Sequence, residues 1–161
     1  YSAFIPNITS GDVVICYGDI IFDHRIGNNL LKKKYNFIPV KKKWIYLWKK
    51  RMSEKEIKND AENLIIKNNI VKKIGEKIQN SFPKYQFMGL IKLKNKTYNK
   101  LKIFFNKESM KNIDFTNFLN LSIKKRLLVL RTYPTDLFWY EIDTLKDFKI
   151  AEDNLKDLYK I

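Results

Sequence analysis

Cysteine and histidine are almost absent from this chain, which has one of each, Cys16 and His24. A single cysteine cannot form a disulfide within the chain, and metal sites built from cysteine and histidine need several such side chains. We therefore expect no disulfide and no Cys/His metal cluster, and a reducing compartment such as the cytoplasm. The chain begins at Tyr1 instead of Met, which indicates a segment of a longer protein.

Glycine is scarce, and long apolar runs are absent. The sequence has five glycines that never cluster, so it offers no glycine-rich loop to cradle phosphates: Gly11, Gly18, Gly27, Gly75 and Gly89. No apolar run approaches the length of a membrane span, and we expect none. With 45% hydrophobic residues over 161 positions, the chain is nevertheless long enough to bury a substantial core.

Acidic residues are outnumbered, because 32 Lys and Arg accompany 17 Asp and Glu and give a net charge of +15. Such a charge favours a polyanionic partner. Lys, Asn and Ile are abundant together, as in an AT-rich coding sequence, which is a second explanation for the charge. Three basic runs lie at 32–34, 41–43 and 49–51 without the pattern of a nucleic-acid recognition module. We expect them on solvated surface and expect no nucleic-acid partner. A non-catalytic basic module that binds nucleic acid or a protein is the alternative.

The stretch that follows Asp12 organises the chain. Its apolar run 13–17 predicts a strand buried on both faces, of the kind found at the centre of a parallel sheet. Gly18 allows the backbone to turn, and Asp19 then places a carboxylate at the carboxyl end of the strand, where open α/β sheets bind ligands. The alternative for Asp19 is a turn residue or a helix cap.

Helical and extended patterns alternate along the rest of the chain. Apolar spacing and capping residues predict helices at 23–34, 44–51, 98–105, 114–121 and from 144 onwards, and Ser53 with Glu56 forms a capping box that starts a surface helix or an irregular insertion. Strands are expected at 37–40, with Pro39 at an edge or bulge, and at 70–75, 85–93, 127–131 and 138–143. This alternation predicts one α/β domain over residues 1–161.

Carboxylates occur at two strand ends, with Asp19 at one and Glu141 and Asp143 at the other. Mg²⁺ prefers oxygen ligands and takes one or two protein carboxylates, leaving its other positions to water and substrate phosphates. The pattern therefore indicates a magnesium site for phosphoryl or nucleotidyl transfer. Glycosidases also use paired carboxylates, and a polar strand edge followed by a helix cap is the purely structural alternative.

Two tryptophans, Trp44 and Trp48, lie four positions apart and so share one face of the predicted helix. Core packing is the ordinary role of such a pair. The alternative is an aromatic wall beside a pocket, which would hold a cationic or quaternary ammonium group by cation–π attraction. Asp114 is a good helix cap and a secondary candidate for a contact to such a group.

Four segments, in order along the chain, resemble motifs of the small nucleotidyltransferases, the family that includes choline-phosphate and phosphonate cytidylyltransferases and sugar-phosphate nucleotidyltransferases. SGDVVICYGDIIF at 10–22 is similar to their metal-binding strand, and WIYLWKKR at 44–51 to their Trp-rich helix that ends in Arg. FMGLIKL at 87–93 resembles the strand whose glycine faces the substrate. WYEIDTLKD at 139–147 resembles the acidic motif before the last helix.

The resemblance implies a three-layer α/β/α fold of the nucleotide-diphospho-sugar transferase type. It also implies Mg²⁺-dependent transfer of a nucleotidyl group from CTP or another NTP to a phosphorylated or phosphonylated acceptor, such as phosphocholine or aminoethylphosphonate, with release of pyrophosphate. Asp19 would be one magnesium ligand and Glu141 or Asp143 the other, since a one-residue slip or a bulge turns either inward.

The same resemblance implies acceptor-binding roles, which we assign to Tyr17, Trp44, Trp48, Gly89 and Asp114. Trp44 is the first candidate for the wall that faces the amine of the acceptor, and Trp48 is the second. A sugar-1-phosphate is the alternative acceptor, but the paired tryptophans favour one that carries an amine. The alternative sugar-phosphate enzymes would be expected to use polar contacts in place of aromatic ones.

The chain departs from the family at the nucleotide site. The family opens with a glycine-rich loop carrying an Arg, followed by a strand and a Lys, and nothing here resembles this region. An acidic residue often precedes the Trp helix, where this chain has lysines at 41–43. We therefore expect the metal- and acceptor-binding C-terminal part of a nucleotidyltransferase, N-terminally incomplete, with a missing N-terminal segment as its partner. If 161 residues were the entire protein, NTP binding would be weak or absent and turnover would fail.

Overall fold

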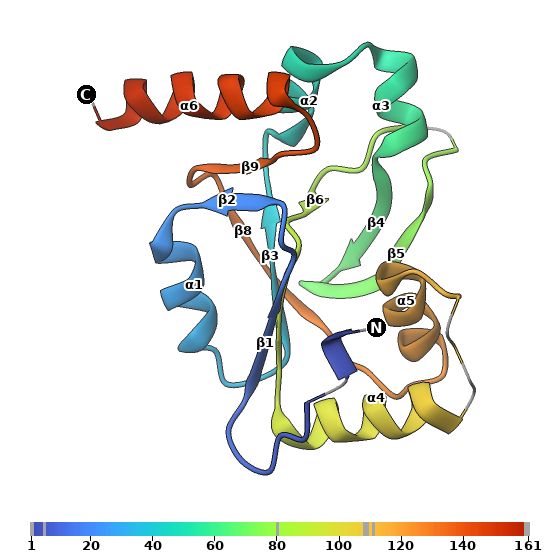
Figure 1. The fold of residues 1–161 in the computed structure, drawn as a ribbon. Helices are drawn as coiled ribbons and strands as arrows, with labels where there is room; N and C mark the ends of the chain where they lie inside the picture. Colours follow the sequence, from blue (N-terminus) through green and yellow to red (C-terminus); the bar gives the residue numbers. More distant parts are fainter. Residues whose placement is uncertain (1, 5, 80, 108–109, 111, 160–161) are drawn as a thin grey trace.

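The computed structural model describes residues 2–4, 6–79, 81–107, 110 and 112–159, and it folds around a mixed sheet (Figure 1). The sheet has the strand order β1-β7-β3-β8-β5-β4, with β6 paired to β3. Only β3 and β8 run parallel. Its strands are β1 (Val13–Cys16), β3 (Phe37–Lys41), β4 (Glu62–Lys67), β5 (Ile70–Lys77), β6 (Gln86–Phe87), β7 (Leu90–Leu93) and β8 (Arg131–Thr135).

A second, two-stranded ribbon and six helices complete the described part of the chain, after a single 3₁₀ turn, η1 (Ser2–Phe4). The ribbon pairs β2 (Ile20–Phe22) with β9 (Trp139–Glu141) in antiparallel register. The helices are α1 (His24–Leu31), α2 (Trp44–Arg51), α3 (Glu54–Asp60), α4 (Asn95–Lys107), α5 (Phe115–Lys124) and α6 (Leu145–Tyr159).

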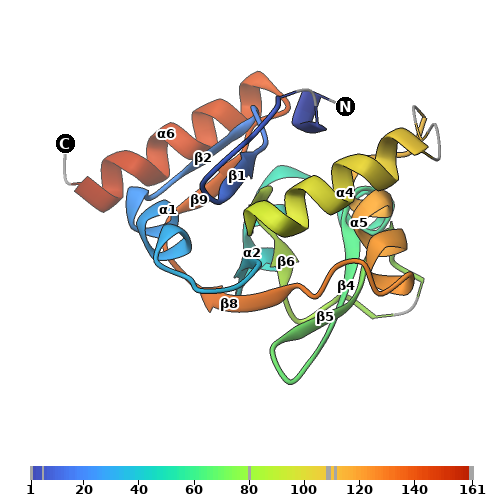
Figure 2. The same cartoon turned by 90° about the horizontal axis from the view of Figure 1, so that it is seen from below.

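Alternating side chains divide the core into two halves, one on each face of the sheet. Ile91 and Leu93 of β7 face a cluster that includes residues of α4 and α5, whereas Leu90 faces a cluster that includes residues of α1, α2 and α3 together with Trp139 of the ribbon. Two apolar clusters on opposite faces of one sheet give the three-layer α/β/α architecture that the resemblance implied. The views from two directions agree, with α4 and α5 on the side of the sheet opposite to the ribbon and α6 (Figure 2).

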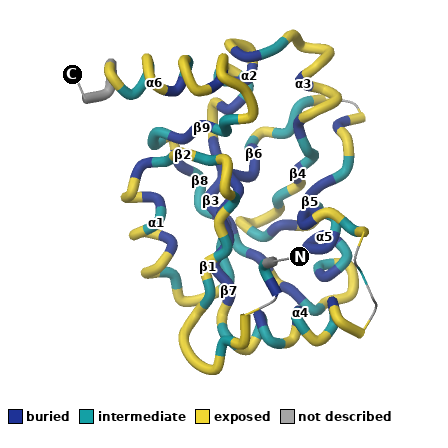
Figure 3. Tube along the Cα trace, in the orientation of Figure 1, coloured by how far each residue is buried: buried dark blue, intermediate teal, exposed yellow. Residues whose placement is uncertain are grey.

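The prediction that residues 13–17 form a central parallel strand was wrong. Among the described residues β1 pairs with β7 alone, in antiparallel register, and so it lies at an edge of the sheet. Its inner face carries Val13 and Ile15, which pack on the core, while Val14 on the other face is 39% exposed. A run of apolar residues does not distinguish burial on both faces from an apolar side chain left uncovered (Figure 3).

Pro39 was expected at an edge or a bulge, and β3 does not lie at an edge, because it lies between β7 and β8. The reason is that the neighbouring strand on one side of β3 is interrupted. β7 pairs with β3 at Phe37 and β6 pairs with it at Val40, so Pro39 faces the interruption between β6 and β7 at residues 88–89. A residue without an N–H donor is tolerated at such a break in the ladder.

Most helix signals were confirmed, because capping is encoded locally. Asp23 caps α1 by accepting a hydrogen bond from the Arg25 N–H, and Ser53 with Glu56 forms the expected capping box of α3. The strand expected at 127–131 was wrong, since β8 begins only at Arg131. No helix in the described ranges is long and apolar enough to span a membrane.

Candidate active site

The turn after β1 carries Asp19 to the end of the ribbon. The Tyr17 N–H donates to the Gly89 carbonyl at 2.9 Å, and the Ile142 N–H donates to the Asp19 carbonyl at 2.8 Å. Ile20 is paired with Glu141 across the ribbon. Two segments more than a hundred residues apart in sequence therefore bring Asp19 and Glu141 to one end of β2 and β9.

Gly89 is required by its neighbour. Its φ of +73° lies in the left-handed region, and a Cβ atom there would lie 3.1 Å from the Tyr17 side chain. The glycine thus allows the strand 85–93, expected to be continuous, to break into β6 and β7 directly beneath Tyr17. Gly89 and Tyr17, both assigned to the site by the resemblance, therefore lie in direct contact.

A cavity of about 210 Å³ opens at this point. Five residues proposed from the sequence line it, and so do two acidic side chains that the sequence reasoning missed, Asp60 and Glu62. The lining consists of Tyr17, Trp48, Asp60, Ala61, Glu62, Gln86, Phe87, Gly89, Glu141 and Asp143. Its walls are therefore aromatic and its polar groups predominantly acidic.

Trp44 is not among the lining residues. Its indole N–H donates to the Pro83 carbonyl at 2.8 Å, and its ring packs edge-on against Trp48 at 5.8 Å between centroids. Trp48 faces the cavity instead, stacked on Trp139 at 5.4 Å and donating weakly to Asp60 at 3.4 Å. The two tryptophans share a helix face, as expected, but only one of them borders the cavity.

Asp114 reaches the cavity indirectly. Its carboxylate caps α5 by accepting from the Asn117 N–H at 2.8 Å, and it also accepts from the Thr116 hydroxyl at 3.1 Å. The same hydroxyl, which has a single proton, also lies within hydrogen-bond distance of the Glu62 carboxylate, and Glu62 lines the cavity. Asp114 is therefore a helix cap, and Thr116 connects it to Glu62 in the lining of the cavity.

Negative charge accumulates around Glu141. Burial, followed by the nearby carboxylate of Asp143, raises its pKa to about 7, and Asp19 and Asp60 act in the same direction against the cation Arg51. Burial, with Asp114 and Asp60 nearby, also raises the pKa of Glu62. Burial is thus the main cause of both shifts, and neighbouring carboxylates add to it.

Arg51 is the cation within this group, and it is almost fully buried, with 2% of its side chain exposed. It contacts Asp147 at 2.7 Å, Asp143 at 2.6 Å and Glu141 at 3.7 Å. The sequence reasoning had assigned the run 49–51 to solvated surface, and for Arg51 this was wrong. The charge pattern does not distinguish Arg51 from its neighbours, because its partners come from β9, from α6 and from the turn between them.

The carboxylates fit a divalent cation at the cavity edge. In the described ranges no three or more His, Cys, Asp or Glu side chains gather as a ready-made metal cluster. Mg²⁺ needs only one or two protein carboxylates, however. Glu141 lines the cavity, whereas Asp19 is not among the lining residues and reaches Glu141 through the paired end of the ribbon. These two carboxylates are the ones that could hold such a cation, and burial, followed by the neighbouring carboxylate of Asp143, raises the pKa of Glu141.

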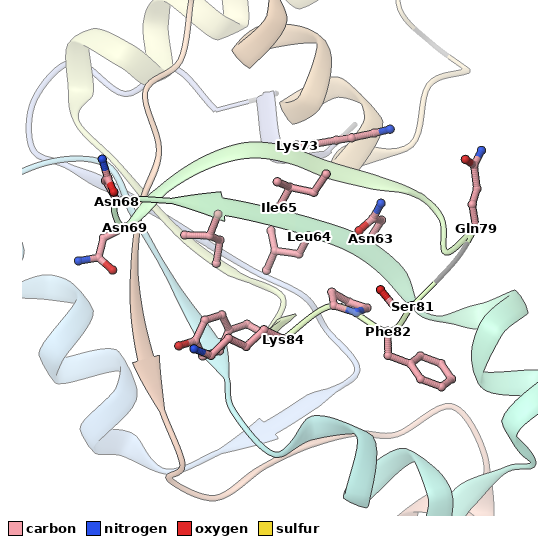
Figure 4. Close-up of a pocket in the computed structure, with 13 residues that line it drawn as sticks. Asn63, Leu64, Ile65, Asn68, Asn69, Lys73, Gln79, Ser81, Phe82 and Lys84 are labelled. Atoms are coloured by element: carbon pink, nitrogen blue, oxygen red, sulfur yellow. The ribbon is translucent and has the colours of Figure 1, made fainter.

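A larger cavity, of about 720 Å³, lies elsewhere, along β4 and the segment 81–85 (Figure 4). Its polar lining consists of amides, a serine and lysines, including Asn63, Lys73 and Lys84, and no acidic side chain contributes to it. Because the predicted carboxylates do not border this cavity, we place the candidate active site at the smaller, acidic one.

Two of the three basic runs contain a residue that is buried in the fold. Lys41 is buried and donates to the carbonyls of Asp136 and Leu137, and Arg51 is buried among carboxylates. These two basic side chains therefore form contacts within the fold and are not available to an external polyanion. This arrangement does not favour a basic nucleic-acid module.

The fold is that of nucleotidyltransferases. The chain is similar to the inositol-1-phosphate CTP transferase from T. maritima, with a TM-score of 0.67 and 20% identity over 98% of this chain and 62% of that one. It is also similar to the CTP:phosphocholine cytidylyltransferase from Streptococcus pneumoniae, with a TM-score of 0.61 and 18% identity over 89% and 57% of the two chains. A UDP-glucose pyrophosphorylase complexed with UDP-glucose is similar as well, with a TM-score of 0.60 and 10% identity over 93% of this chain and 58% of that one.

These likenesses confirm the fold that the sequence resemblance implied. The chain spans between 57% and 62% of the length of these three solved structures. No protein-family model and no curated protein sequence matches it.

Proposed function

We propose that this chain is the metal- and acceptor-binding part of a Mg²⁺-dependent nucleotidyltransferase. A phosphate or phosphonate oxygen of the acceptor attacks the α-phosphorus of CTP or another NTP, and pyrophosphate leaves. The observation that carries the proposal is the acidic, aromatic-walled cavity beside Asp19 and Glu141 in a chain of nucleotidyltransferase fold. The proposal needs no covalent nucleophile, because positioning and electrostatic stabilisation suffice for this chemistry.

Asp19 and Glu141 are the residues we propose to hold the metal. A divalent cation bound there would neutralise the charge of the phosphates during displacement. Glu141 is the better candidate of the two carboxylates in the acidic motif, because Asp143 already accepts a hydrogen bond from Arg51 at 2.6 Å. Tyr17, held by its backbone bond to Gly89, closes the side of the site next to β1.

The acceptor we propose carries an amine or a quaternary ammonium group, as phosphocholine and aminoethylphosphonate do. Tyr17 and Phe87 supply aromatic rings, and Asp60 and Glu62 supply negative charge. Trp48 completes the apolar wall, but its ring is 2% exposed and already contacts Trp139 and the Arg51 guanidinium. The buried Gln86 Oε1 has no hydrogen-bond partner among the described residues and adds a further acceptor. Ligand pockets are usually about 300–1,000 Å³, so a cavity of about 210 Å³ suits a small head group. A sugar-1-phosphate, which offers hydroxyls, would gain less from these aromatic and acidic walls.

The nucleotide, in this proposal, is held largely by a further segment that packs beside β1. The outer backbone edge of β1 is unpaired among the described residues, and Val14 on its uncovered face is 39% exposed. An apolar edge strand of this kind ordinarily needs a neighbour. A strand and helix added there would complete the sheet next to Asp19, where the triphosphate must lie.

The first test measures acceptor binding alone. Titration calorimetry should detect phosphocholine or phosphoethanolamine and only weaker binding of glucose-1-phosphate. Tyr17→Leu should lower the affinity about tenfold, because it removes a partly exposed aromatic ring from the cavity wall. Tyr46→Leu, a matched change at an exposed tyrosine outside the cavity lining, should cost much less. Equal losses in the two variants would argue against the aromatic wall, and preference for the sugar phosphate would favour the alternative acceptor.

The second test measures pyrophosphate release with several pairs of NTP and acceptor. It uses the chain expressed together with the N-terminal segment that the proposal requires. Asp19→Asn should lower the rate about a thousandfold, since metal-assisted charge neutralisation is worth several kcal/mol. Asp136→Asn serves as the control, because Asp136 is 45% exposed and 4.0 Å from Lys42, away from the cavity lining. Retained magnesium-dependent turnover in the Asp19 variant would refute the assigned role.

A further inference from the structure

Arg51 binds three carboxylates unequally. Its Nε donates to Asp147 at 2.7 Å and its Nη2 to Asp143 at 2.6 Å, whereas the distance from Nη1 to Glu141 is 3.7 Å. Nη1 is buried and has no hydrogen-bond partner among the described residues. The guanidinium therefore gives its hydrogen bonds to two of the carboxylates and leaves the third with electrostatic attraction only.

The Arg51 side chain is held in place on several sides. Its guanidinium lies 4.8 Å from the Trp48 ring centroid, and Lys146 donates to the Arg51 carbonyl at 2.7 Å. Asp147, only 5% exposed, uses its second oxygen to accept from the Thr144 N–H at 2.9 Å and the Thr144 hydroxyl at 2.8 Å. Since Asp147 binds both Arg51 and the turn at Thr144, the direction of the guanidinium is fixed relative to the end of β9.

The two carboxylates of the acidic motif consequently differ in availability. Asp143 is hydrogen-bonded by Arg51, although half of its side chain is exposed. No hydrogen bond from the described residues reaches the Glu141 carboxylate, which is 25% exposed and lies beside Asp19 at the ribbon end. The N–H groups of a planar guanidinium point in fixed directions, so it can donate hydrogen bonds to some neighbouring carboxylates and not to others. An ammonium group is a compact charge without this fixed geometry.

We infer that Arg51 is a positioning residue that acts as an internal cation for Asp143, so that Glu141 remains the carboxylate available, with Asp19, to an external divalent cation. The inference rests on the cation site of the proposed function and deepens it. It assigns Asp143 to the orientation of Arg51 and gives a structural reason for an arginine at the end of α2.

The inference makes a prediction that a merely structural role does not make. If the arginine charge is removed, Asp143 becomes available and can replace Glu141. A second mutation should then restore cation binding that a first mutation has abolished. Loss of a purely structural contact would lower both stability and cation binding, and it would restore nothing.

The experiment measures Mn²⁺ binding by electron paramagnetic resonance, with Mn²⁺ as the probe for Mg²⁺. Glu141→Gln should weaken binding about a hundredfold, and Asp143→Asn alone should weaken it much less. Arg51→Gln combined with Asp147→Asn removes the cation together with the buried carboxylate that it would otherwise leave unpaired. Adding this pair to Glu141→Gln should recover about tenfold in affinity, and a further Asp143→Asn should abolish the recovery.

Arg51→Lys is the matched control, because it keeps the buried charge, and with Glu141→Gln it should recover no more than about twofold. Thermal unfolding of every variant shows whether it is folded. If the variants with Arg51→Gln do not fold, the contrast between Glu141→Gln and Asp143→Asn decides, and equal losses overturn the inference. If the wild type binds Mn²⁺ but the variants with Arg51→Gln and Asp147→Asn recover no affinity, the inference about Arg51 is overturned while the proposed cation site stands. Absence of Mn²⁺ binding in the wild type overturns the cation site of the proposed function as well.

Discussion

The two ends of the β2–β9 ribbon carry carboxylates in opposite electrostatic states. At one end Asp23, with 1% of its side chain exposed, accepts from the Arg25 N–H at 2.8 Å and from its guanidinium at 2.9 and 2.5 Å. These side-chain hydrogen bonds hold the pKa of Asp23 at about 2. At the other end the pKa of Glu141 is raised to about 7, because it is buried beside Asp143 and Asp19.

The difference separates a structural carboxylate from a candidate functional one. Asp23 is compensated by a neighbour two positions away and caps α1, so its charge stabilises the fold. Glu141 shares its cation with two better-placed carboxylates, and its charge therefore opposes folding. An uncompensated buried carboxylate at the edge of a cavity indicates a ligand that supplies the missing positive charge.

Replacement of Glu141 by Gln gives the largest expected effect on stability. Because the folded-state pKa of Glu141 exceeds its ordinary value of 4.5, the folded state binds the proton more tightly, and stability falls as pH rises from 4.5 to 7. The shift corresponds to about 3 kcal/mol, and we expect about 2 kcal/mol because the side chain is 25% exposed. Glu141→Gln should thus be more stable than the wild type by about 2 kcal/mol at pH 8.5.

Urea unfolding without divalent cations at pH 4 and pH 8.5 measures this effect. At pH 4 the two proteins should differ little, since Glu141 is protonated in both the folded and the unfolded state. A variant less stable than the wild type at pH 8.5 would contradict the picture of an uncompensated charge.

Replacement of Asp23 by Asn should act in the opposite direction. Asparagine can still cap α1, but it loses the charge-assisted bonds to Arg25, and we expect a destabilisation of about 1.5 kcal/mol at pH 7. Because the pKa of Asp23 is lowered, its contribution is present above its ordinary value of 3.8 and is lost as pH falls to about 2. The same urea titrations at pH 7 and pH 2 measure it, and a loss that persists undiminished at pH 2 would exclude a charge-based origin.

The two ends also differ in how well the sequence predicts them. Asp23 is followed within two residues by its partner, and local caps of this kind were recognised, as was the capping box at Ser53. The motif residues Asp19, Gly89 and Glu141 were selected by their order in four motifs along the chain. The fold brings Gly89 and Glu141 to one cavity and places Asp19 at the end of the ribbon, next to the residue that pairs with Glu141. The features that the sequence did not predict depend on contacts between residues far apart in the chain.

Arg51 illustrates the hidden part. Its sequence neighbours Lys49 and Lys50 make it look like one member of a solvated basic run, and only α6, nearly a hundred residues later, shows that it is buried. Asp60 and Glu62 were overlooked for a related reason, since a polar helix end gives no sign that a strand follows and turns both side chains to a cavity. The edge position of β1 was likewise decided by its neighbours in the sheet.

Arg25 provides the smallest and most selective test of the comparison. Its side chain is 59% exposed, so water can replace part of what Arg25→Ala removes, while the residue 25 N–H continues to bind the Asp23 carboxylate. We therefore expect a loss of about 1 kcal/mol, smaller than for Asp23→Asn. The pKa of Asp23, followed by NMR, should rise toward 3.8, because the guanidinium is the main cause of its lowering. The pKa of Glu141 at the other end of the ribbon should not move, and a shift there would mean that the two ends are electrostatically coupled and that the contrast drawn between them fails.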